Sequence, residues 1–160
     1  MAVGRIQSPG RSVHVRSGAD ALAVVSRLAA TPARPETIAL LLDDGRLCRT
    51  SLVVEGTREP DDVLSVARLL AEASEREPSI HAVVLASVRT DHVDAAPIIR
   101  REHEGCLRDD VDRWLELLDV FGGVGVDLLD WFVLGHGEAA SLRALTGLAA
   151  RRSSGREGSR

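Results

Sequence analysis

Lysine is absent from this chain of 160 residues, and aromatic residues and cysteines are scarce. Cys48 and Cys106 lie far apart and form no Cys-x-x-Cys pair, which indicates buried thiols in a reducing compartment rather than a disulfide scaffold. No apolar run reaches the roughly 20 residues of a membrane-spanning helix, and the sequence after Met1 lacks the apolar segment of a signal peptide. We therefore expect a cytoplasmic protein that has no membrane partner.

The charged residues that are present leave a small negative excess. All 20 basic residues are arginine, against 24 acidic residues, and the formal net charge is −4. That balance gives no general attraction to nucleic acid, apart from a weak, salt-sensitive contact through the arginines of the C-terminal tail. We expect a protein partner instead.

The length suits one domain, and a hydrophobic content of 44% is enough for a buried core. We expect a flexible N-terminus over residues 1–12, the domain over residues 13–148 and a disordered, arginine-rich tail over residues 149–160. Trp114 and Trp131 are predicted core residues. Because aromatic residues are few, Leu, Val and Ala must supply most of the packing.

Apolar periodicity and turn residues predict alternating helices and strands. The expected order is a helix from Ser17, a hairpin of Thr37–Leu42 and Leu47–Val54, a helix from Pro60, a strand over His81–Ala86, mostly loop over residues 87–106, a helix from Asp109 and a closing hairpin over Val126–Arg143. Trp114, Leu115 and Phe121 are among the residues expected on the inner face of the last helix. This order predicts an α/β (α+β) fold, with a mixed sheet packed by helices.

Three local stretches carry more information than periodicity. Pro35-Glu36 precedes an apolar strand that ends in Asp43-Asp44, and Val54-Glu-Gly-Thr57 precedes a helix. The closing hairpin reads Leu-Leu-Asp-Trp-Phe-Val-Leu-Gly-His-Gly-Glu over residues 128–138. Together these stretches resemble the RadC-like branch of the JAB/MPN (JAMM) metallopeptidase domains, over roughly residues 13–148. The resemblance implies a single domain with a curved mixed sheet and a cytidine-deaminase-like architecture.

The resemblance also implies where a zinc site would lie. Glu36 stands at the position of the family's general base, and Asp110 at that of the aspartate ligand. The family's His-x-His pair falls on Ser87 and Arg89, and its supporting serine falls on Leu107. The motif is therefore degenerate in this chain.

Zinc needs about three protein ligands and an open position, and they are usually imidazole, thiolate or carboxylate groups. Serine is a poor neutral ligand, and arginine cannot lose its proton to become one. An Arg89 guanidinium could instead pair with the carboxylates of Glu36 and Asp110 and replace the charge of the metal. The hypothesis is a pseudoenzyme that binds no metal and acts as a binding or scaffolding module.

Two alternatives remain open. His92 and His103, with Asp110, could form a remodelled zinc site, which would make the protein an active zinc-dependent metallopeptidase or isopeptidase. RadC-type proteins have also been described as DNA-repair factors, so a DNA-repair-associated accessory protein is a third reading. Residues 1–35 show no helix-hairpin-helix module of the kind that contacts DNA in that family.

Overall fold

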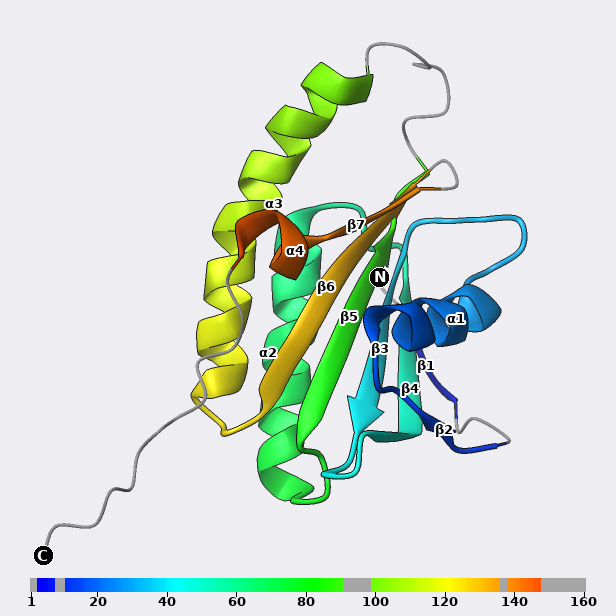
Figure 1. The fold of residues 1–160 in the computed structure, drawn as a ribbon, viewed down its shortest axis with the longest axis vertical. Helices are drawn as coiled ribbons and strands as arrows, with labels where there is room; N and C mark the ends of the chain where they lie inside the picture. The colour runs from blue at the N-terminus through cyan, green and yellow to red at the C-terminus, as the bar shows by residue number, and fades with distance from the viewer. Residues whose placement is uncertain (1–2, 8–10, 91–98, 136–137, 148–160) are drawn as a thin grey trace, which may run out of the picture.

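The computed structural model describes residues 3–7, 11–90, 99–135 and 138–147, with the backbone alone for residues 99–108. This part of the chain contains seven strands and four helices (Figure 1). The strands are β1 (Val3–Gln7), β2 (Val13–His14), β3 (Glu36–Leu42), β4 (Leu47–Glu55), β5 (Ala82–Val88), β6 (Asp127–Gly135) and β7 (Glu138–Ser141). The helices are α1 (Gly18–Leu28), α2 (Pro60–Arg76), α3 (Ile99–Gly122) and α4 (Leu142–Thr146).

The seven strands form one mixed sheet in the order β1-β4-β3-β5-β6-β7, and β2 pairs with β4 beside this path. Only β5 and β6, among the described strands, run parallel, and α3 makes the crossover between them. The other neighbours are antiparallel. The prediction of a mixed sheet packed by helices within one domain is confirmed.

Helices cover the two faces of the sheet unequally. α1 packs on one face, whereas α2 and α3 pack on the other (Figure 1). The core on the α1 face includes Val25, Ile38 and Val84. The core on the α2/α3 face includes Trp114 and Trp131, and both tryptophan side chains are fully buried as predicted.

Local sequence explains where the first two helices begin. Ser17 caps α1, because its Oγ accepts a hydrogen bond from the Asp20 amide at 3.2 Å. Glu59 and Asp62 form a reciprocal capping box at the start of α2, and Pro60 occupies the first turn, where its missing N–H is no loss. Both helices start where the sequence pattern predicts.

Three predictions need correction. The N-terminal segment 1–12 includes β1, which pairs along its whole length with β4, so the part from Val3 to Gln7 belongs to the sheet. α3 begins at Ile99, inside the stretch of residues 87–106 that was predicted to be mostly loop. Leu115 is 45% exposed rather than inward, because Leu117 takes the fully buried position on that helix.

The closing hairpin forms as predicted through β6 and β7, with Phe132 opposite Ser141. The returning strand ends sooner than expected, since Ser141 also caps the short helix α4 by accepting a hydrogen bond from the Ala144 amide. His136 and the predicted tail lie outside the described residues. No helix in the described part of the chain is long and apolar enough to cross a membrane.

Candidate functional site

The residues at the His-x-His position lie at the end of β5, between β3 and β6. Side chains alternate between the two faces of a strand, and Val88 belongs to the core on the α1 face. Ser87 and Arg89 therefore point to the α2/α3 face, where α3 carries Asp110. The structure brings these three residues to one face, as the resemblance implies.

Arg89 and Asp110 form a two-pronged ion pair. Arg89 Nη1 donates to Asp110 Oδ2 at 2.8 Å, and Arg89 Nη2 donates to Asp110 Oδ1 at 2.6 Å. The Asp110 side chain is 1% exposed and that of Arg89 is 13% exposed. Parallel hydrogen bonds of this kind are the strongest arrangement for a guanidinium and a carboxylate, and both oxygens of Asp110 are engaged by the same cation.

Ser87 serves the core on this face. Its Oγ accepts a hydrogen bond from the indole Nε1 of Trp131 at 2.9 Å, and both residues are buried. A buried indole N–H without an acceptor would cost free energy, so Ser87 has a structural role that is independent of any metal. The same contact places the large Trp131 ring next to the hydroxyl that the resemblance aligns with the first histidine of the family.

Glu36 does not join this cluster. It pairs in register with Val88 on the neighbouring strand, and its neighbours along β3 on the same face belong to the α1-side core. Its Oε1 accepts a hydrogen bond from the Ala30 amide at 2.8 Å, and its Oε2 lies 3.9 Å from Arg34 Nε. The predicted pairing of Arg89 with both carboxylates is therefore correct for Asp110 and wrong for Glu36.

Thr37, and not Glu36, is the β3 residue that shares the α2/α3 face with Ser87. It lies opposite Ser87 in the β3–β5 register, and its Oγ1 is 2.8 Å from the Oγ1 of Thr57. Both threonines are buried. Neighbouring residues of a strand point to opposite faces, so Glu36 and Thr37 lie on different sides of the sheet. That alternation is the only sequence signal for this arrangement.

The described side chains do not fit a zinc ion. Arg89 places a permanent positive charge beside Asp110, whose two carboxylate oxygens are both occupied, and the Ser87 hydroxyl is engaged by Trp131. No group of three or more His, Cys, Asp or Glu side chains that could hold a metal occurs among the residues whose side chains are described. His92, and the side chains of His103 and Leu107, lie outside that set.

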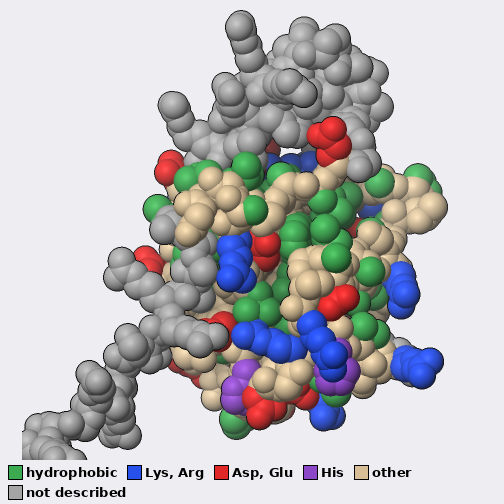
Figure 2. Space-filling view, viewed as in Figure 1, with side chains coloured by type: hydrophobic (Ala, Val, Ile, Leu, Met, Phe, Trp, Pro, Cys, Tyr) green, Lys and Arg blue, Asp and Glu red, His purple; other side chains and the backbone are tan. Residues whose placement is uncertain are grey.

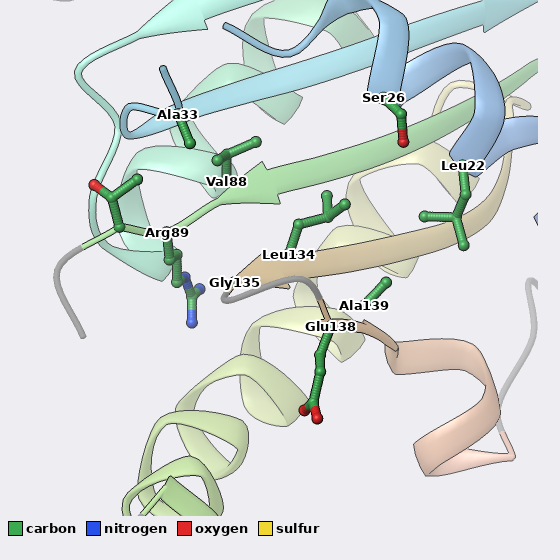
Figure 3. Close-up of a pocket in the computed structure, with 10 residues that line it drawn as sticks. Leu22, Ser26, Ala33, Val88, Arg89, Leu134, Gly135, Glu138 and Ala139 are labelled. Atoms are coloured by element: carbon green, nitrogen blue, oxygen red, sulfur yellow. The ribbon is translucent and has the colours of Figure 1, made fainter. Parts of the chain in front are cut away.

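Arg89 also lines a cavity of about 590 Å³ on the α1 side of the strand ends (Figure 3). Leu22 and Ser26 of α1 form one wall, and Leu134 and Glu138 from the closing hairpin form another. The described lining is mainly apolar; its charged residues are Glu138 and Arg89, and the guanidinium of Arg89 is bound to Asp110. This composition, an apolar hollow with a few polar groups, is typical of binding sites.

Gly135 lines the cavity beside the Arg89 backbone. The Arg89 amide donates a hydrogen bond to the Leu134 carbonyl oxygen at 2.9 Å, which holds the chain after β5 against the end of β6. A Cβ atom at Gly135 would lie 3.4 Å from the Arg89 carbonyl oxygen, at the short end of ordinary van der Waals contact.

Comparison with known proteins adds no family assignment. No protein-family model matches the chain, and a search of curated proteins finds no match. The site is therefore interpreted from its own geometry and from the resemblance in sequence.

Proposed function

We propose that this protein is a RadC-like JAB/MPN domain that works as a non-catalytic binding or scaffolding module for a protein partner. In this proposal the domain has the curved, cytidine-deaminase-like sheet of that family, and an internal ion pair stands where the family holds zinc. The observation that carries the proposal is the buried, two-pronged contact between Arg89 and Asp110. A guanidinium in that place repels a dication and cannot activate a water molecule.

The partner site in this proposal is the cavity that Arg89 shares with α1 and the closing hairpin. Its apolar walls can bury a partner side chain, and the charge of Glu138 can orient the chain that carries it. β7 is the edge strand of the sheet beside this cavity, so its outer side offers backbone groups to an extended segment. The strand edge is the feature that supports a protein partner.

The absence of catalysis is tested with hydrolysis assays. The purified full chain is incubated with zinc and with peptide-linked and isopeptide-linked substrates, and cleavage is followed by mass spectrometry. The proposal predicts no cleavage above that of an Asp110→Ala variant. Zinc-dependent turnover that disappears in this variant would establish the metallopeptidase alternative instead.

The binding site is tested with two arginine substitutions on α1. Ser26 is exposed and lines the cavity, so Ser26→Arg is expected to obstruct it without disturbing the core. Ala23 is also exposed on α1 but is not one of the cavity residues, so Ala23→Arg is the matched control. A partner that is captured by the wild type and by Ala23→Arg, and lost with Ser26→Arg, supports the placement. Equal capture by all three proteins would refute it.

A further inference from the structure

A second cavity, of about 190 Å³, lies on the α1 face at the opposite end of the helix from the first. Three arginines from distant parts of the sequence line it: Arg16 before α1, Arg46 in the turn between β3 and β4, and Arg143 in α4. Among the described residues that line it, Asp130 is the only acidic one. Basic side chains gather near the middle of this face in Figure 2.

The carboxylate of Asp130 is already engaged by its own corner of the fold. Its Oδ1 accepts hydrogen bonds from the amides of Trp131 at 2.8 Å and Arg143 at 3.1 Å. Its Oδ2 accepts one from Ser141 Oγ at 2.5 Å. Asp130 therefore organises the junction of β6, β7 and α4, and its single negative charge faces three arginines among the described residues that line the cavity.

Arg46 is the least satisfied of the three arginines. Its Nη1 is buried and has no hydrogen-bond partner, and its Nη2 lies 4.0 Å from Asp127 Oδ2, at the limit of an ion pair. Its backbone is held firmly, because the Arg46 amide donates to the Asp43 carbonyl oxygen and its own carbonyl oxygen accepts from Val15. The Arg46 side chain is 37% exposed as a whole, so its guanidinium reaches the cavity, and its buried Nη1 donor has no acceptor within the described part of the chain.

The other two arginines, Arg16 and Arg143, are exposed, and their guanidinium groups can donate hydrogen bonds to a ligand. Arg143 Nη1 donates one long hydrogen bond, 3.5 Å, to the Leu129 carbonyl oxygen, and no ion pair to Arg143 or Arg16 is present among the described side chains. Ser17 and Gly18 of the α1 N-terminus also line the cavity, and the Asp20 carboxylate in the first turn of α1 accepts a hydrogen bond from the Arg16 amide, so the helix end is already matched by a negative charge.

We propose that this cavity, named here the arginine cavity, binds a phosphate-type oxyanion, either free or as the phosphoryl group of a small molecule. Guanidinium groups match the geometry of phosphoryl oxygens, and three of them converge here around one hollow. The volume corresponds to about six water-sized volumes of ~30 Å³ each, which suits a phosphoryl group with few further atoms. The site is independent of the proposed protein-binding function.

Isothermal titration calorimetry on the full chain tests this proposal with sodium phosphate, glycerol phosphate and sodium chloride at matched ionic strength. The variants are Arg46→Gln and Arg143→Gln, and the control is Arg27→Gln, which removes the same charge from an exposed site in the last turn of α1. We expect one phosphate per wild-type chain and an affinity at least about tenfold lower in each cavity variant, as for the loss of a charge-assisted hydrogen bond. Arg27→Gln is expected to bind like the wild type.

Each outcome decides the question. Binding of phosphate alone identifies a free anion as the ligand, and tighter binding of glycerol phosphate identifies a phosphorylated small molecule; both support the site. No heat beyond that of sodium chloride overturns the proposal. An equal loss in Arg27→Gln and in the cavity variants also overturns it, because the attraction is then unspecific. Circular dichroism melts of all variants identify any loss of binding that comes from unfolding, and Arg143→Gln, at an exposed position, provides a second test if Arg46→Gln unfolds.

Discussion

Arginine is used in two opposite ways on the two faces of this sheet. On the α2/α3 face, Arg89 is largely buried and both prongs of its guanidinium are matched by Asp110. On the α1 face, Arg46 is held in a turn and has a buried donor without a partner. The comparison shows that an arginine beside a cavity indicates a ligand site only when its guanidinium lacks a full set of partners within the protein.

The largest expected effect comes from breaking the satisfied pair. Arg89→Ala leaves the Asp110 charge buried without its partner, and we expect the free energy of unfolding to fall by about 3–5 kcal/mol. Urea denaturation measures this loss. Arg76→Ala is the matched control, because Arg76 pairs with Glu72 at the surface, where such a pair contributes about 0–1 kcal/mol. A loss in Arg89→Ala no larger than the control would contradict the interpretation of the pair.

Replacing both partners sharpens this test. Arg89→Leu with Asp110→Leu removes both charges and keeps apolar volume, so the double variant is expected to recover most of the stability that Arg89→Ala loses. The same denaturation experiment, run as a double-mutant cycle, gives the coupling free energy of the pair. A double variant as unstable as Arg89→Ala would show that the site depends on charge for a reason other than pairing.

A substitution at Ser87 tests whether this residue has a structural role in the core. Ser87→Ala removes the acceptor for the buried Trp131 indole, and we expect a loss of about 1–3 kcal/mol in unfolding free energy. Ser65→Ala is the control, because Ser65 makes its hydrogen bond to the Asp61 carbonyl oxygen at an exposed site. The Trp131 indole N–H resonance, followed by NMR, should shift in Ser87→Ala alone. Similar stability for the two variants would remove the structural role of Ser87.

Glu36 provides the corresponding test on the α1 face. Glu36→Ala leaves the Ala30 amide without its buried acceptor, so thermal and urea unfolding should show a loss of about 1–3 kcal/mol. Glu36→Gln keeps an acceptor oxygen and should retain most of the stability. If both variants are as stable as the wild type, Glu36 has no structural role, and this result would favour its role as a general base.

The smallest expected effect concerns the turn that carries Arg46. The amide of Leu47, and then the side chain of Arg49, donate hydrogen bonds to Asp43 and lower the pKa of its carboxyl group. A lowered pKa means that ionised Asp43 stabilises the fold above its ordinary pKa of about 3.9, and that this stabilisation is lost as the pH falls through the lowered value. Asp43→Asn should therefore melt slightly below the wild type at neutral pH. The two melting curves should approach each other as the pH falls below the ordinary pKa of an aspartate, and a difference that stays constant down to strongly acidic pH would contradict the assignment.

Continuous apolar runs and capping residues predicted most of the fold. β3, β5 and the starts of α1 and α2 follow from Thr37–Leu42, His81–Ala86, Ser17 and Pro60, because buried strands and helix caps leave local signals. The first part of α3 could not be predicted, since residues 99–108 are polar and show no helical period. β1 is short and depends on pairing with β4, a contact that is remote in sequence.

The candidate site was predictable only in part for the same reason. The pairing of Arg89 with Asp110 could be predicted, because a guanidinium and a carboxylate that the resemblance brings close together form a strong two-pronged pair. The face on which Glu36 lies depends on strand register, and a shift of one residue inverts it. The Ser87–Trp131 contact depends on the β5–β6 register and on an irregularity between Val83 and Val84, which no local pattern encodes.

The most direct test of the central claim is the zinc content of the wild-type protein, purified without chelators from zinc-supplemented medium. Elemental analysis by mass spectrometry gives the ratio of zinc to chain, with Asp110→Ala as the reference for adventitious metal. Because Arg89 occupies the carboxylate that a metal would need, we predict substoichiometric zinc that is unchanged in the variant. One zinc per chain that is lost in Asp110→Ala would contradict the account and indicate a working metal centre.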